Sequence, residues 1–268
     1  MWRALIACIF GLFLACTGST VMAHEPLFGV GPHTLFRNGL GLETEIAVED
    51  DRLSIHNEAI YGVTADLAVT LAAPWHRKDD VNGAESGLGD ISLRGKWCFY
   101  RRDFPGGQDA LALIFGAKLP TGNNDLVVPL GTGSIDYFGG IAAGRESRRW
   151  YYFGDLRYRF NTSANRLKHG NVVFYDVAWG VRPIRSGYDR PDLVLLVEAN
   201  GSSTGKGSLD GVKNPNTGGR RLSVSPGFLL SLRNVMLKGG VNFPVFWKLN
   251  GVQKDPDSEF VMGVEFHL

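Results

Sequence analysis

Residues 258–268, S-E-F-V-M-G-V-E-F-H-L, are the stretch that decides the fold. Side chains alternate along it: one parity holds Phe260, Met262, Val264, Phe266 and Leu268, and the other holds Val261, Gly263, Glu265 and His267. A period of two is the period of a β-strand with one apolar and one mostly polar face. The apolar face needs an apolar neighbour, which is either the core of a soluble domain or lipid.

The composition of the chain limits the classes of protein to which it can belong. The chain has 268 residues, enough for one large β-domain or two smaller ones. Its hydrophobic content of 44% is too low for a bundle of membrane helices. The formal net charge is +1 and there are no basic clusters, so nothing in the charge pattern favours binding to nucleic acid.

The N-terminus has the features of an export signal. Arg3 precedes an apolar run over residues 4–15, and Val21-Met22-Ala23 ends in small residues. We expect a signal peptide over residues 1–23, with His24 as the first residue of the mature protein. The alternatives are a membrane anchor, for which the apolar run is short, and lipoprotein processing at Cys16. After cleavage Cys98 is the remaining cysteine, which excludes an internal disulfide.

The rest of the chain is a series of alternating runs separated by turn residues. They predict twelve strands, longer than the five or six residues usual in soluble sheets and close to the ~9–11 that a tilted transmembrane strand needs. Pro226 and Pro244 fall inside strands, and we expect a bulge or bend at each. The predicted strands cover residues 41–48, 52–62, 67–73, 90–100, 110–119, 134–145, 149–160, 172–181, 192–200, 220–231, 235–247 and 258–268.

The connections alternate in length. Most are brief on one side (residues 63–66, 101–109, 146–148, 182–191 and 232–234), whereas the others are mostly longer (74–89, 120–133, 161–171, 201–219 and 248–257). Short periplasmic turns and longer external loops are typical of an antiparallel, up-and-down transmembrane β-barrel of the bacterial outer membrane. We therefore predict an all-β protein with an N-terminal tail at 24–40 and a barrel of about twelve strands at 41–268. The first and last strands should pair and close the sheet.

In such a barrel the apolar faces meet lipid and the charged faces line the lumen. Aromatic residues near strand ends, such as Trp150, Trp179 and Trp247, should face lipid. Two interpretations of the charged lumen stay open: a field that orients a small solute, or opposite charges that pair and block the barrel. The candidate lumen residues that would contact a solute are Asp90, Arg94, Lys96, Lys118, Asp136, Asp155, Arg157, Arg159, Asp176, Glu198, Lys238 and Glu265.

Several motifs carry a resemblance to a known family. They are Gly87-Leu88-Gly89-Asp90, Lys118-Leu119-Pro120-Thr121-Gly122, residues 130–136 (L-G-T-G-S-I-D), Tyr61-Gly62-Val63-Thr64, Ser225-Pro226-Gly227 and Phe243-Pro244-Val245. As a set, they resemble the outer-membrane family named "MetA-pathway of phenol degradation", often described as transporters. The resemblance implies a barrel that takes up small hydrophobic or aromatic compounds.

The sequence gives little sign of catalysis or cofactors. It lacks G-x-S-x-G and H-E-x-x-H, and Gly201-Ser202-Ser203-Thr204-Gly205-Lys206 lacks the spacing of a phosphate-binding loop. Ser54, His56 and Glu58 share the lumen parity, either as a Ser-His site or as a polar wall. His24, with a free amine and His33 nearby, would bind Cu(II) unless the tail is simply flexible. No cofactor and no other metal site is expected.

We therefore expect a channel or transporter for the passive uptake of a small solute, and not an enzyme. The alternatives are an outer-membrane enzyme acting on lipid and a structural barrel. The expected partners are outer-membrane lipid, the solute, and the barrel-assembly machinery, whose signal the aromatic C-terminal strand resembles except that Leu268 replaces the usual final Phe. No nucleic-acid partner is expected.

Overall fold

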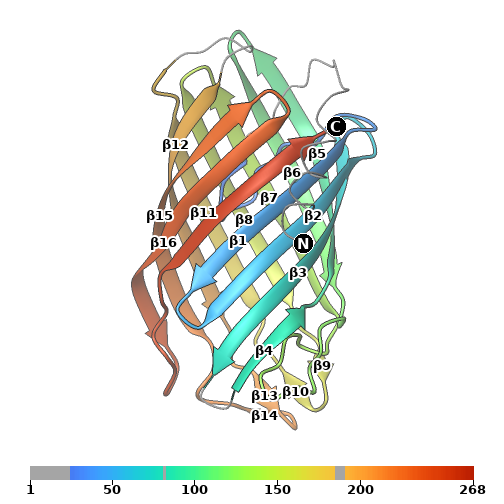
Figure 1. The fold of residues 1–268 in the computed structure, drawn as a ribbon, viewed down its shortest axis with the longest axis vertical. Helices are drawn as coiled ribbons and strands as arrows, with labels where there is room; N and C mark the ends of the chain where they lie inside the picture. Colours follow the sequence, from blue (N-terminus) through green and yellow to red (C-terminus); the bar gives the residue numbers. More distant parts are fainter. Residues whose placement is uncertain (1–24, 81–82, 185–190) are drawn as a thin grey trace, which may run out of the picture.

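The computed structural model describes residues 25–80, 83–184 and 191–268, and these form a closed antiparallel barrel of twelve strands. Figure 1 shows the strands tilted strongly against the long axis of the barrel. The wall consists of β1 (Leu40–Glu49), β2 (Arg52–Gly62), β3 (Leu67–Asp80), β5 (Ser92–Phe104), β6 (Gly107–Lys118), β7 (Asp136–Ser147), β8 (Trp150–Phe160), β11 (Val172–Val181), β12 (Asp192–Thr204), β15 (Gly219–Leu232), β16 (Val235–Leu249) and β17 (Glu259–His267).

The predicted closure between the two ends of the chain is confirmed. β17 pairs with β1 along its length, with Phe266 opposite Leu42 and Phe260 opposite Val48. β1 also pairs with β2, which pairs with β3, so the sheet has no free edge in the wall.

The predicted alternation of faces is also confirmed. On β17 the side chain of Met262 is 49% exposed on the outer surface, whereas Val261 is 2% exposed and His267 is 3% exposed on the inner side. Large apolar side chains lie exposed on the outside of every wall strand, for example Leu156 on β8 and Val177 on β11. Within the described ranges, no helix is long and apolar enough to cross a membrane.

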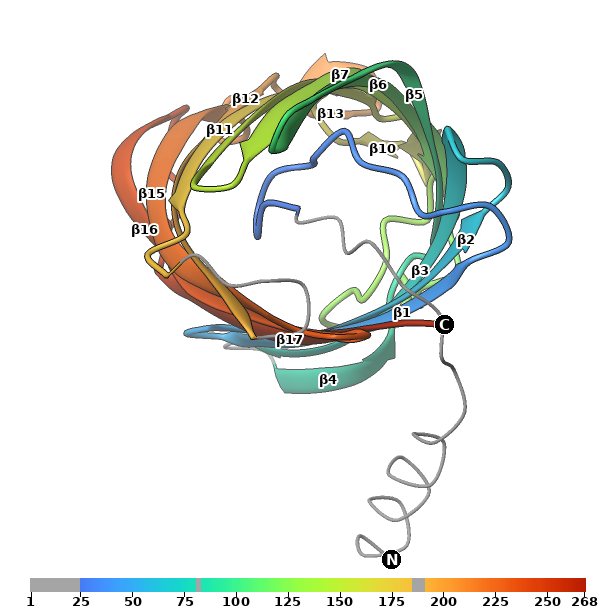
Figure 2. The same ribbon diagram turned by 90° about the horizontal axis from the view of Figure 1, so that it is seen from above.

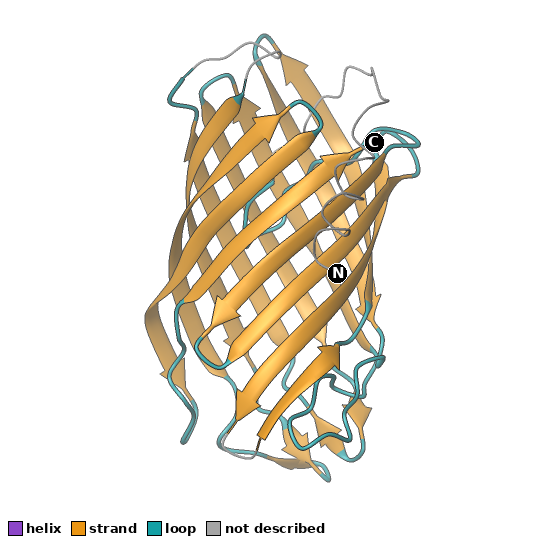
Figure 3. Cartoon of the chain, viewed as in Figure 1, coloured by secondary structure: helices purple, strands orange, loops and turns teal. Residues whose placement is uncertain are grey.

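The two ends of the barrel differ. We call the end with the C-terminus and the brief connections the turn end, and the opposite end the loop end. Figure 3 shows that strands continue into the loop end, where the structure has more strand than the sequence predicts. The additional strands are β4 (Gly83–Leu88), which pairs with β3, and β9 (Ser163–Ala164), β10 (Leu167–Lys168), β13 (Ser208–Leu209) and β14 (Val212–Lys213), which form a small separate sheet.

Predicted connections at both ends of the barrel are therefore wrong in extent. Residues 74–89 form most of a β-hairpin instead of a loop, because β3 continues to Asp80. At the turn end, residues 101–109 are mostly strand, since β5 reaches Phe104 and β6 starts at Gly107. Gly106 supplies the positive φ (83°) that this two-residue turn requires.

A β-bulge in β16 changes the side of the barrel to which Trp247, predicted to face lipid, points. The bulge expected at Pro244 is confirmed: Ser223 pairs with Pro244 but Leu222 pairs with Phe246, so Val245 is the extra residue. Beyond it Trp247 pairs with Arg221 on the inner side, so its predicted lipid-facing orientation is wrong.

The register is unchanged across Pro226, where Val224 pairs with Phe243 and Gly227 with Gly240. Of the bulge or bend expected there, the bulge is absent. A second bulge, at Phe99, was not predicted.

Candidate functional site

The lumen is occupied by the chain's own N-terminal segment. Figure 2, which looks down the barrel, shows the described residues before β1 crossing the inside of the ring. We call residues 25–34 the lumen segment. The expectation of a flexible tail is wrong for this stretch, because it is packed against the inner wall: Val30, Pro32 and His33 are all buried.

Glu198 on β12 is the main anchor of the lumen segment. Its carboxylate accepts hydrogen bonds from three successive backbone N–H groups, those of Leu27 (2.5 Å), Phe28 (3.1 Å) and Gly29 (3.2 Å). Asn200 donates a further bond to the same carboxylate. Successive amides converging on one anion form a nest, and the bonds are charge-assisted. Because Glu198 is only 1% exposed, these bonds replace the water that the carboxylate loses.

Asp155 on β8 supports the next residue of the segment. It accepts a 2.6 Å hydrogen bond from the backbone N–H of Val30. The guanidinium of Arg157 lies between Asp155 and Asp176, at 2.6 Å from each carboxylate. Two predicted acidic residues and one predicted basic residue thus form a compact ionic group that contacts the segment at Val30.

The opposite wall holds the segment through Lys96 on β5. Its ammonium pairs with the Glu25 carboxylate and donates a 3.1 Å hydrogen bond to the carbonyl of Gly31. Near the turn end, Thr34 donates a 2.8 Å hydrogen bond to the carbonyl of Ala65 and accepts one from Arg101. The segment is therefore fixed from both sides of the barrel.

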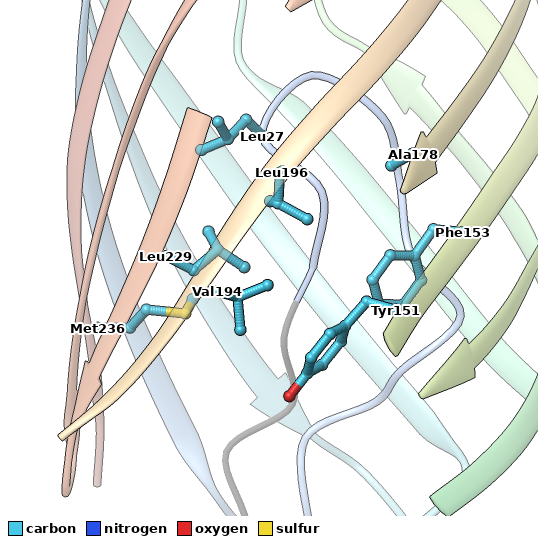
Figure 4. Close-up of a cluster of buried hydrophobic side chains, with 8 residues drawn as sticks. All are labelled: Leu27, Tyr151, Phe153, Ala178, Val194, Leu196, Leu229 and Met236. Atoms are coloured by element: carbon cyan, nitrogen blue, oxygen red, sulfur yellow. The ribbon is translucent and has the colours of Figure 1, made fainter. Parts of the chain in front are cut away.

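An apolar pocket receives the side chain of Leu27. Figure 4 shows Leu27 beside Val194, Leu196 and Leu229, which project inward from the wall. The wall residues of this Leu27 pocket come from β8, β11, β12, β15 and β16: Tyr151, Phe153, Ala178, Val194, Leu196, Leu229 and Met236. Phe28 packs against the edge of the same cluster.

Two glycines make room for Leu27. Gly227 and Gly240 face each other on β15 and β16. A Cβ atom on Gly227 would lie 2.1 Å from Leu27 Cδ1, and one on Gly240 would lie 2.8 Å away. The glycine of the Ser225-Pro226-Gly227 motif is thus a site of close contact with the lumen segment.

A second group of predicted residues fixes the connection between β6 and β7 at the loop end. We call residues 119–135 the inner loop, since Figure 2 shows this connection within the outline of the barrel. Asp90 accepts hydrogen bonds from the backbone N–H groups of Gly122 (3.0 Å) and Thr132 (2.8 Å). Lys118 binds both Asp90 (2.6 Å) and Asp136 (2.9 Å).

Burial would raise the pKa of Asp90, but the hydrogen bonds from Lys118, Thr132 and Gly122 outweigh it and hold that pKa below its usual range. The motifs containing Asp90, Lys118, Gly122 and Thr132 therefore meet at one place, where they fix the inner loop.

The other predicted lumen residues are paired within the wall, with one exception. Arg94 binds Glu58 at 2.8 Å, Lys238 binds both Glu43 and Glu45, and Glu265 contacts His267 at 2.6 Å. Arg159 instead stacks its guanidinium 5.4 Å from the ring centre of Phe174, and its Nε has no hydrogen-bond partner among the described residues. Mutual pairing thus accounts for most of the charged lumen.

The other candidate groups do not assemble as expected. Ser54 contacts His76 Nδ1 at 2.9 Å, whereas Glu58 is engaged by Arg94. His56 lies edge-on to His76, with ring centres 5.9 Å apart. His24 and the signal peptide lie outside the described residues. His33 is buried and lies 3.5 Å from Glu146, and the described ranges contain no group of three potential metal ligands.

Sequence reasoning missed the Leu27 pocket. One signal was available: residues 193–197, L-V-L-L-V, are apolar on both parities. A lipid-facing strand with a wet inner face needs apolar residues on one parity alone, so this run indicates that the inner face is also covered.

The sequence comparison settles the family. The family described as "Putative MetA-pathway of phenol degradation" matches residues 32–245. The chain belongs to this family. The match starts inside the lumen segment and includes every motif on which the resemblance was based. No curated protein sequence matches the chain.

Solved structures support the fold. The crystal structure of an outer membrane channel from Pseudomonas putida F1 superposes with a TM-score of 0.66 over 95% of this chain and 98% of that chain, at 12% identity. LpxR from Salmonella typhimurium has a TM-score of 0.45 at 9% identity, over 84% of this chain and 99% of that chain. The first likeness confirms the β-barrel fold; the second is too distant to carry an argument.

Proposed function

We propose that the protein is a passive outer-membrane channel for a small solute. A continuous outer surface of exposed apolar side chains, from Leu42 on β1 to Met262 on β17, fits a lipid environment. The turn end would then face the periplasm and the loop end the exterior. Export through a signal peptide at residues 1–23 and insertion by the barrel-assembly machinery belong to the same proposal.

The observation that supports the proposal is that residues 25–34, which belong to no wall strand, occupy the lumen. In a purely structural barrel of few strands, side chains of the wall fill the interior. Here a chain segment that belongs to no strand occupies much of the space, attached by hydrogen bonds and an ion pair to Glu198, Asp155 and Lys96. Withdrawal of residues 25–34 would leave a lumen lined by charged pairs and by the apolar residues of the Leu27 pocket, whereas it would break no strand pairing of the wall.

The family description supports the nature of the solute. Members are grouped under phenol degradation. A small aromatic or hydrophobic solute also fits the apolar Leu27 pocket beside the polar lumen. The structure represents the closed form of the proposed channel.

Planar-bilayer recordings test the proposal. Purified wild-type protein should conduct in brief openings, and Leu27→Asp should conduct for most of the recording, because a carboxylate does not enter the Leu27 pocket. Phe36→Asp, at an exposed position just outside the lumen segment, is the matched control and should behave like the wild type. Absence of conductance in correctly folded Leu27→Asp would refute the channel function.

A further inference from the structure

The Leu27 pocket resembles a binding site for a small apolar ligand, and in this structure the Leu27 side chain occupies it. Val194 and Leu229 are fully buried and Met236 is 1% exposed, and Leu27 lies at one end of the buried cluster that they form. Gly227 and Gly240 widen the wall where Leu27 Cδ1 approaches. An apolar hollow of this kind on the inner wall has no role in closing the barrel, since the strands around it pair through their backbones.

A strong hydrogen-bond acceptor lies directly beside the hollow. The same residue that fills the pocket also donates its backbone N–H to Glu198 at 2.5 Å. Leu27 therefore satisfies two requirements together: an apolar body for the hollow and a donor for the buried carboxylate. A small molecule that replaces Leu27 and releases the segment must supply both, because the buried carboxylate then loses three of its four donors.

We propose that the Leu27 pocket binds a small molecule with an apolar body and a terminal hydroxyl or amine donor, which displaces Leu27 and releases the lumen segment. The inference rests on the proposed channel function, for which it identifies the solute class and the opening step. The solute binds where the segment was held, so binding and opening are one competition. A molecule without a donor leaves Glu198, once the segment is released, with the Asn200 amide as its one donor among the described residues, and does not displace the segment.

Competition is feasible because Leu27 is the side chain of the segment that lies within this pocket, whereas Val30 packs in a separate apolar cluster with Ile114 and Ala142. Val30 and Gly31, which bind Asp155 and Lys96, do not enter the pocket. A ligand in the pocket thus removes the Leu27 and Glu198 contacts first, and the remaining contacts are the apolar packing of Val30 and polar contacts that water can replace.

Thiol accessibility measures the release directly. Val30→Cys in a Cys98→Ala background places the reporter thiol at a buried position of the segment that does not line the pocket. The rate of modification by a membrane-impermeant maleimide is measured in proteoliposomes with benzyl alcohol or with benzyl methyl ether. The ether has a similar apolar body but no donor, and it controls for effects on the bilayer.

Benzyl alcohol should raise the modification rate about tenfold at saturation, since it shifts the population of the released segment, and the ether should leave it unchanged. Leu27→Ala, which removes most of the apolar contact, should raise the rate without ligand about 30-fold. Phe36→Ala, outside the pocket, should have no effect.

The outcomes separate the inference from the channel function. Equal acceleration by both compounds, or acceleration by neither while Leu27→Ala is fast, would overturn the ligand site and leave the channel standing. Fast modification of Leu27→Ala without any conductance in bilayers would overturn the channel function, whereas a selective effect of benzyl alcohol would still support the binding site.

Discussion

Replacing Glu198 with glutamine should release the lumen segment with little effect on the barrel. The substitution keeps the length of the side chain but removes its charge and one of its two acceptor oxygens. Three backbone N–H groups, those of Leu27, Phe28 and Gly29, then compete for one amide oxygen. The new NH₂ group cannot accept a hydrogen bond from any of them, because it is itself a donor.

The expected magnitude follows from these contacts. Hydrogen bonds to a charged group contribute about 1.5–3 kcal/mol each and neutral ones about 1 kcal/mol, so the seated state loses about 3 kcal/mol. The neutral side chain is easier to bury, which returns about 1 kcal/mol. A net loss of about 2 kcal/mol raises the fraction of released segment about 30-fold.

Hydrogen exchange of the backbone amides of residues 27–30 is the direct assay. Their exchange in Glu198→Gln should accelerate by about the same 30-fold if exchange occurs from the released state. Glu58→Gln is the matched control, because Glu58 is a lumen carboxylate that binds Arg94 instead of the segment. Unchanged exchange in Glu198→Gln, or an equal acceleration in the control, would refute the assignment of Glu198 as the anchor.

Three further predictions concern other parts of the molecule. Lys96→Met removes the contacts of the second wall with the segment, so protease cleavage within residues 25–34 should become at least several-fold faster while the barrel stays resistant. Leu156→Arg places a charge on the outer surface, where an arginine near the middle of the bilayer costs about 2–4 kcal/mol; folding into liposomes monitored by heat-modifiable mobility should show the loss, and normal insertion would contradict the lipid-facing assignment. Asp90 has a lowered pKa in the folded protein, so its stabilisation of the inner loop is complete above the unfolded pKa of about 3.9 and is lost as the pH falls through the lower folded value. Exchange of the Gly122 and Thr132 amides should therefore accelerate below that pH, and in Asp90→Asn it should be fast and independent of pH after correction for intrinsic exchange.

The architecture could be predicted because each wall strand carries its own signal. Alternation of apolar and polar side chains in 258–268 or 172–181 depends on local spacing, and it specifies both the strand and the side that faces lipid. The pairing of the two terminal strands followed from the need to remove sheet edges. The face of Trp247 could not be predicted, because one extra residue at Val245 reverses the parity of everything beyond it.

The site was predicted in part. The twelve charged residues were identified from parity, but parity does not say which charges meet, and the inner loop brings Asp90 to Thr132 across 42 residues. The lumen segment was missed because residues 25–34 have no alternation and are rich in glycine and proline. Its contact with Glu198 joins residues 171 positions apart and leaves no local pattern.

The seam between β1 and β17 constrains the order in which the molecule is assembled. Leu40 and Leu268 exchange backbone hydrogen bonds at the seam, and the lumen segment ends only a few residues before Leu40. Pairing of the first strand with the last requires nearly the whole sheet to be in place, so the seam is among the final contacts to form. A cylinder that closed with residues 25–34 outside would have to admit them afterwards through its turn end. The segment is therefore best inserted before the barrel closes. The fraction of molecules with an occupied lumen then depends on the order of folding steps, because molecules that close first leave the segment outside.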